Sequence, residues 1–190
     1  MGSSSADARH NARGTSNRLI EIALLMAVVL WLGVWPYLDI LDQYPWGSDA
    51  IKWAHRGSLD YSRWKHWVFE SNHFIGYRPV TAGSFVLGQA IAGYAPWMYR
   101  GTDLVLHASV AVSAWWLVRV WVGRPTPRAL IAPALLLLHP VSEMVVTHVP
   151  RRSYTLATLF ALLAVAAFTA AARGRRADAV KASSSFTAVS

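Results

Sequence analysis

The sequence predicts an all-α fold, a multi-pass membrane helical bundle with about four transmembrane helices and interfacial helices in a long first outer loop. Hydrophobic residues make up 54% of the chain and charged residues only 15%, a balance too apolar for an ordinary soluble domain. The apolar residues gather in runs of about 20, the length that a bilayer core of about 30 Å requires. Because arginines flank these runs, membrane topology explains the net charge of +8 better than nucleic-acid binding does.

The predicted membrane domain covers residues 19–172, including an outer loop at 39–100. We expect a disordered cytoplasmic N-terminus at 1–18 and a disordered cytoplasmic tail at 173–190, since both are polar and lack periodicity. Arginines beside the first and last apolar runs place both termini in the cytoplasm. The preference for Arg over Lys and the Ala and Val content favour a bacterial inner membrane over the endoplasmic reticulum.

The first transmembrane helix is predicted at residues 19–38. Glu21 lies near its cytoplasmic end, where we expect the carboxylate to pair with Arg18 or to reach water. Tryptophans mark the far interface, as an aromatic belt does, and Pro36 indicates that the helix is ending there.

The outer loop interleaves aromatic and charged residues, which beside a membrane indicates segments lying at the level of the headgroups. Its last part, residues 79–97, is only moderately apolar and can either span or lie at the interface. If it spanned, the basic loop at 123–128 would face outward, so the positive-inside rule favours an interfacial position.

A clear membrane helix is predicted at residues 101–122, and it contains Asp103 and His107. These two residues are four positions apart and therefore share one helix face. His107 is either hydrogen-bonded to a neighbouring helix or part of a polar cavity. The last membrane helix is predicted at residues 154–172.

Residues 129–149 form the expected fourth span, but they contain Pro140. Residues 129–139 alone rise only about 16 Å as a helix, which is too short to cross a bilayer. Either the helix continues past a kink at the proline, or a short helix is buried in the bundle. If it continues, His139 and Glu143 share a face.

A short polar cluster separates the last two apolar runs. It contains His139, Glu143, His148, Arg151 and Arg152. Such groups persist at membrane depth only when they are paired, hydrated or functional, and the alternative is an ordinary charged rim at the membrane surface. The spacing fits no zinc signature and the chain has no cysteine, so we expect no metal site.

Three stretches resemble the GT-C superfamily of membrane glycosyltransferases, in particular the N-terminal membrane part of the tetratricopeptide-repeat protein O-mannosyltransferases. They are WGSDAI, GYRPVTAGSFVLGQAIAGYAPWMYRGTDLVLHA and LLLLHPVSEMVVTHVPRRSYTLATLFALLA. The resemblance implies transfer of a sugar from a polyprenyl-phosphate donor to an acceptor hydroxyl on the outer face, with no further cofactor.

The resemblance also implies site residues. Asp49, in the first stretch, takes the position of the acidic group that accepts the proton of the acceptor hydroxyl. The donor lipid phosphate would be bound by residues that face the same outer cavity: Arg78, His139, Glu143, Arg151 and Arg152. Arginine is suited to this task because its planar guanidinium matches phosphate oxygens in pairs.

Two departures leave catalysis open. The family commonly has paired acidic residues where this chain has Ser48 and Asp49, and its enzymes continue into further membrane helices and soluble repeats. The alternative is a non-catalytic integral membrane subunit with a truncated GT-C scaffold, which binds a partner or lipid within a larger complex. Both hypotheses take the bilayer as the main partner, allow other membrane subunits and exclude nucleic acid.

Overall fold

The computed structural model describes residues 3–43, 68–69, 78–93, 95–148 and 151–187. This described part of the chain is helical and contains no strand. Three of its segments are long and apolar enough to cross a membrane, namely Thr15–Ile40, Pro96–Val122 and Arg152–Arg175. The all-helical prediction is thus confirmed for the described residues, which contain three candidate membrane spans where we expected about four.

The first of these segments changes helix type along its length. α1 (Ser3–Val28) continues into a π-helix, η1 (Val29–Val34), and then into a 3-10 helix, η2 (Trp35–Ile40). Pro36 lies in the first turn of η2 and has no N–H to donate. The segment therefore ends within η2, close to the predicted position.

α5 (Pro96–Val122) and α8 (Arg152–Thr187) are the other two long helices, and they match the spans expected at 101–122 and 154–172. Gly123 ends α5 in the left-handed conformation, with φ of 75°, which glycine adopts without steric strain. The chain then reverses toward the next helical segment.

Both terminal segments are helical where we expected disorder. α1 begins at Ser3, inside the region 1–18, and α8 extends to Thr187, inside the region 173–190. Alanine and arginine, which are frequent in both regions, are strong helix formers. Each terminal segment therefore extends the membrane helix beside it.

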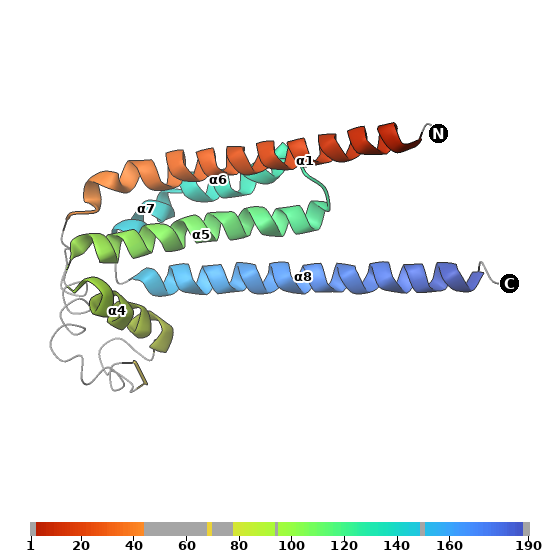
Figure 1. Ribbon diagram of the computed structural model, residues 1–190. Coiled ribbons are helices and arrows are strands. Elements are labelled where there is room, and N and C mark those ends of the chain that lie inside the picture. Colours follow the sequence, from red (N-terminus) through yellow and green to blue (C-terminus); the bar gives the residue numbers. More distant parts are fainter. Residues whose placement is uncertain (1–2, 44–67, 70–77, 94, 149–150, 188–190) are drawn as a thin grey trace.

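α4 (Pro79–Ala92) is an apolar helix of 14 residues. Its rise of about 21 Å is shorter than a bilayer core of about 30 Å. The structure thus agrees with the expectation that the segment 79–97 does not span. In Figure 1, α4 is inclined to the long helices at one end of the bundle.

The expected fourth continuous span at 129–149 is not confirmed, because the helix breaks into α6 (Ile131–Leu138) and α7 (Pro140–Thr147). His139 separates them in an extended conformation, with ψ of 132°. The proline that follows restricts His139 to this region and cannot continue the helical hydrogen bonds. Neither α6 nor α7 alone can cross a bilayer.

The long helices and α6 lie side by side (Figure 1). Direction alternates along the chain, so α1 runs parallel to α6 and α5 runs parallel to α8. Both chain termini and the turn that carries η4 (Pro127–Leu130) lie at one end, here called the termini end. α4, α7 and the beginning of α8 lie at the opposite end, here called the loop end. The three arginine-rich regions thus share the termini end, as the positive-inside argument required.

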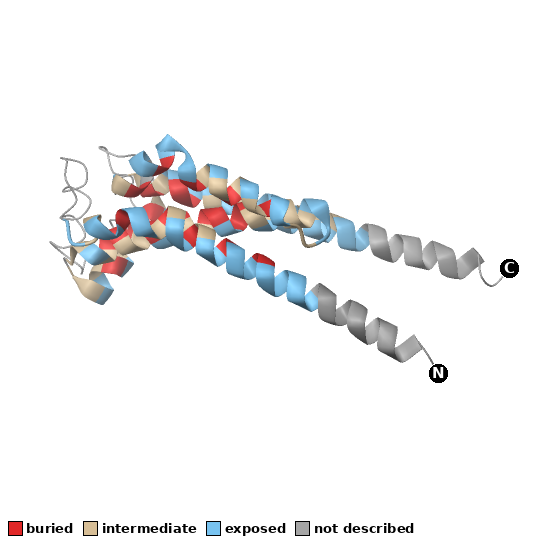
Figure 2. Cartoon of the chain, turned by 90° about the horizontal axis from the view of Figure 1, so that it is seen from above, coloured by how far each residue is buried: buried red, intermediate tan, exposed pale blue. Residues whose placement is uncertain are grey.

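α5 is the central helix, since it packs against α4, α6, α7, α8 and η1. One residue each of α1, η1, α5 and α6 forms a buried cluster where these elements meet: Leu25, Val29, Ala111 and Leu137. Gly33 allows this close approach, because a Cβ there would lie 3.0 Å from Leu137 Cδ2. Buried residues face the interior while the outer faces are exposed and apolar, as lipid contact requires (Figure 2).

Near the termini end, Glu21 is buried and forms an ion pair with Arg119 of α5, with Oε2 and Nη1 2.7 Å apart. Trp115 Nε1 donates to the other carboxylate oxygen at 3.0 Å. The expected pairing with Arg18 or with water is therefore wrong. The buried carboxylate is instead satisfied by two donors of α5, and it links α1 to that helix.

A second polar contact at this end links α8 to α5. Arg173 donates to the carbonyl oxygens of Val120 and Trp121, in the last turn of α5. A helix leaves its last carbonyls without partners, and a cation there also complements the helix dipole. Arg173 thus stabilises the end of α5.

We expect Glu21→Ala to lower the free energy of unfolding by about 2 kcal/mol, because it leaves Arg119 and Trp115 without their acceptor. Unfolding of the purified protein by SDS in mixed micelles measures this loss. Arg124→Ala, which removes an exposed arginine of the neighbouring turn, is the control and should change stability by less than about 0.5 kcal/mol. Equal stability of the two variants would contradict the role of Glu21.

Candidate functional site

A buried ion pair organises the loop end. Arg152, the first residue of α8, donates from Nε to Asp103 Oδ1 of α5 at 2.6 Å. The two side chains are only 1% and 4% exposed, so water screens their attraction little. The pair therefore fixes the beginning of α8 against α5.

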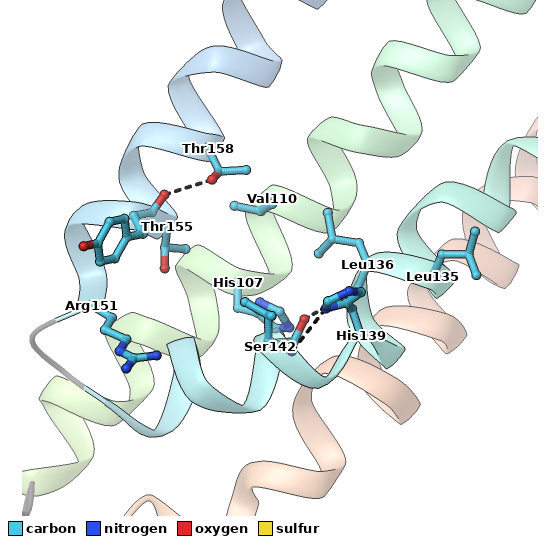
Figure 3. A pocket seen from close by; sticks show the side chains of 11 residues that line it. His107, Val110, Leu135, Leu136, His139, Ser142, Arg151, Thr155 and Thr158 are labelled. Carbon is cyan, nitrogen blue, oxygen red and sulfur yellow. Dashed lines mark hydrogen bonds between the residues drawn. The ribbon is translucent and has the colours of Figure 1, made fainter.

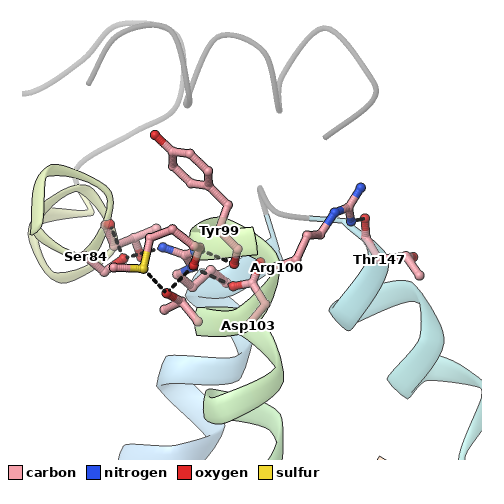
Figure 4. Close-up of polar contacts among 9 residues, drawn as sticks. Ser84, Tyr99, Arg100, Asp103 and Thr147 are labelled. Atoms are coloured by element: carbon pink, nitrogen blue, oxygen red, sulfur yellow. Dashed lines mark hydrogen bonds and ion pairs between the residues drawn. The ribbon is translucent and has the colours of Figure 1, made fainter. Parts of the chain in front are cut away.

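The remaining donors of Arg152 are also used. Nη1 donates to Ser84 Oγ of α4 at 3.1 Å, and Nη2 donates to the carbonyl oxygen of Tyr99 at 3.0 Å. The guanidinium carbon lies 4.1 Å from the centre of the Phe85 ring. Arg152 thus joins α4, α5 and α8 within one polar network (Figure 4).

Two further arginines strengthen the same end. Arg100 is 4% exposed, and it donates to the carbonyl oxygens of Thr147 at the end of α7 and of Gln43 beyond η2 (Figure 4). Arg78 precedes α4 and donates from Nη1 to Ser153 Oγ at 3.2 Å. Among the described ion pairs, Asp103 alone supplies a carboxylate to these arginines. The described loop end therefore carries more positive than negative buried charge.

A cavity of about 740 Å³ lies beside this network, between α5, α6, α7 and α8 (Figure 3). One wall is apolar and the other carries polar groups. The lining residues are His107, Val110, Leu135, Leu136, His139, Val141, Ser142, Arg151, Tyr154, Thr155 and Thr158. Its volume is within the range of small-molecule sites in proteins.

The cavity follows from the break in the α6–α7 segment. α5 forms its floor with His107 and Val110, while α6 and α8 form its sides and α7 borders the loop end. Leu135 and Tyr154 on the two sides are 65% and 61% exposed. The cavity therefore opens at the side of the bundle, toward the region that lipid occupies.

His107 is 3% exposed, and its ring packs edge-on against Tyr37 at 6.3 Å between centres. Its Nε2 atom is buried and has no hydrogen-bond partner among the described residues. Asp103 Oδ2, one turn earlier in α5, is likewise buried and has no hydrogen-bond partner among the described residues. The prediction that Asp103 and His107 share a face is confirmed, and His107 belongs to a cavity wall.

Two of the predicted site residues line the cavity, and the other described ones, Arg78, Glu143 and Arg152, do not. His139 and Arg151 line the cavity, where His139 Nδ1 also accepts a hydrogen bond from Val141 N at the start of α7. Arg152 is buried in its ion pair, and Glu143 is exposed on α7 because the helix does not continue through His139.

Asp49 lies outside the described residues, so its role stays a prediction. Sequence reasoning missed several lining residues that carry hydroxyl groups: Ser142, Tyr154, Thr155 and Thr158. On α8, Thr158 follows Tyr154 by four positions and Thr155 by three, which indicates one helix face. That pattern does not show which neighbour the face meets. In the described ranges, no three His, Asp or Glu residues lie together as metal ligands.

In comparisons with protein-family models, with curated proteins and with solved structures, nothing matches this chain. The site is therefore defined by its own geometry. An apolar cavity with a lateral opening and an arginine at one end suits an amphipathic molecule with an anionic head and a hydrocarbon chain.

A double-mutant cycle tests the buried pair. Asp103→Leu should lower the free energy of unfolding by about 3 kcal/mol, because the Arg152 guanidinium stays buried without its counter-charge. The double variant with Arg152→Leu should lose at least about 1 kcal/mol less than the sum of the single variants. Losses that add within about 0.5 kcal/mol would contradict the pairing.

Arg151→Leu is the matched control for this cycle, since it removes the neighbouring arginine that lines the cavity. It should change the free energy of unfolding by less than about 0.5 kcal/mol.

Proposed function

We propose that this chain is a GT-C-like integral membrane protein that forms part of a glycosyltransferase. It binds a polyprenyl-phosphate sugar and supports transfer of the sugar to an acceptor hydroxyl. The observation that carries the proposal is the laterally open cavity, which combines an apolar wall with Arg151 at the loop end. The motifs that resemble the superfamily supply the reaction class.

The lining of the cavity is chemically suited to a polyprenyl-phosphate donor. An isoprenoid chain can pass from the bilayer over Leu135, Leu136 and Val110 without leaving an apolar surface. The phosphate then reaches Arg151, whose guanidinium pairs with anionic oxygens. A membrane-bound donor needs this lateral access, because its hydrocarbon chain does not leave the lipid.

The proposed reaction needs few protein groups, because the donor is already activated. The acceptor oxygen attacks the anomeric carbon, the bond from that carbon to the phosphate oxygen breaks, and polyprenyl phosphate leaves. Asp49 accepts the hydroxyl proton, and Arg151 neutralises the leaving phosphate. Gln43 lies before Asp49 in the sequence and Arg78 after it, and they form hydrogen bonds with Arg100 and Ser153 at the loop end.

The proposed topology places the termini end in the cytoplasm and the loop end on the outer face, because the arginine clusters lie at the termini end. The membrane proposed is a bacterial inner membrane. Transfer then occurs on the outer face.

The open side of the cavity also favours a second candidate, a non-catalytic subunit whose lipid site is covered by a partner chain in a larger complex. This candidate predicts that the protein is isolated with a fixed partner in mild detergent. It also predicts lipid binding without any transfer by the isolated protein.

Asp49→Asn tests the enzymatic proposal, since an amide cannot accept the hydroxyl proton. We expect at least about a hundredfold loss of labelled-sugar transfer from polyprenyl phosphate in membranes that contain the protein. The control is Asp42→Asn, which changes an exposed carboxylate near the end of η2 and should leave transfer unchanged. Full transfer by the Asp49 variant would refute the assigned role.

Arg151→Ala tests the phosphate contact separately. Losing a charge-assisted hydrogen bond should raise the KM for the lipid donor about tenfold, and Arg151→Lys should restore part of the affinity. Arg128→Ala removes an exposed arginine at the termini end and serves as the control. If Arg151→Ala left the KM unchanged, the proposal that the phosphate binds in this cavity would be refuted.

A further inference from the structure

The floor of the cavity contains a polar atom that the protein itself leaves without a partner. His107 Nε2 is buried and makes no hydrogen bond to any described residue, although the ring lines a cavity of about 740 Å³. Leaving a buried polar group unsatisfied costs about 1–3 kcal/mol, and native proteins rarely tolerate this. Because the ring lines the cavity, a ligand there can supply the partner that no described residue supplies.

We propose that His107 Nε2 binds the phosphorylated head of the lipid directly, as a second contact beside Arg151. The inference rests on the proposed function for the identity of the lipid. It adds the residue that distinguishes a phosphorylated lipid from the corresponding alcohol. Nε2 donates its hydrogen to a phosphate oxygen, while Arg151 pairs with the charge.

The surroundings of His107 favour a polar head over a hydrocarbon chain at this point. Figure 3 shows the ring between the α7 segment that carries Ser142 and the first turns of α8. Ser142 Oγ donates its proton to the carbonyl of Leu136, so its lone pairs can accept from a sugar hydroxyl of the lipid head but do not bind the phosphate oxygens. Thr155, which is buried, follows Arg151 by one turn of α8 and shares its face. Four polar groups from three helices therefore border one space.

The orientation of the imidazole is fixed before a ligand binds. Tyr37 of η2 meets the ring at an interplanar angle of 82°, in the edge-to-face arrangement that aromatic rings prefer. A preoriented donor loses little entropy when it binds, so its contact contributes to affinity and to selectivity. An apolar chain at the same place would leave Nε2 unsatisfied.

The test is binding of farnesyl phosphate to the full-length protein in phosphatidylcholine nanodiscs, measured by isothermal titration. Wild-type protein should bind farnesyl phosphate at least about tenfold more tightly than farnesol. His107→Leu should lose about tenfold in affinity for the phosphate and little for the alcohol. His107→Gln, which keeps an amide N–H, should retain most of the affinity.

The matched control is His148→Leu, which removes an exposed histidine beyond α7 that does not line the cavity. A spectroscopic measurement on the wild-type protein tests the same contact without relying on the folding of a variant. Farnesyl phosphate should shift the imidazole ¹⁵N resonance of His107, assigned by its loss in the His107→Gln spectrum, and should leave that of His148 in place.

The outcomes separate this inference from the proposed function. Wild-type binding with an unchanged His107 resonance and an unaffected His107→Leu variant overturns the role of His107 alone. If neither farnesyl phosphate nor farnesol binds to wild type, the proposed function and this inference both fail. If His107-dependent binding occurs with dioleoyl phosphatidic acid and not with farnesyl phosphate, the phosphate contact stands and the isoprenoid donor is refuted.

Discussion

The ion pair between Arg152 and Asp103 sets the geometry of the loop end. Arg152 begins α8 and is buried against α5, whereas Arg151, directly before the helix, lines the cavity. Arg152 is thus a fixed structural element, because its three side-chain nitrogens all donate within the protein. Its fixed position gives the neighbouring Arg151 a defined place for an anionic ligand.

The break at His139 has a second, complementary effect. A continuous helix across 129–149 would rise about 32 Å, along most of the length of α5, and would cover more of its face. Because the chain extends at His139, α6 stops short and α7 borders the loop end alone, so part of the α5 face stays open to the side. Pro140 has no N–H to donate to the carbonyl of Leu136, and this carbonyl instead accepts from His139 N and Ser142 Oγ.

Sequence reasoning succeeded where the signal is local and failed where it is not. The three long helices follow from apolar runs of membrane length, and the shared face of Asp103 and His107 follows from helical spacing. The partner of Glu21 was missed because Arg119 is distant in sequence, and only the antiparallel packing of α1 and α5 brings them together. Composition could not separate Arg151 from Arg152, since their difference arises from which side of α8 faces α5.

The same network holds Gln43 and Arg78, which lie before and after Asp49 in the sequence. The carbonyl of Gln43 accepts a hydrogen bond from Arg100, which also holds the end of α7. Arg78 donates to Ser153, two residues beyond Arg151. Arginines bonded to the helices around the cavity therefore hold both positions. The described lining of the cavity contains no carboxylate, so the proposed transfer requires a proton acceptor from outside this wall.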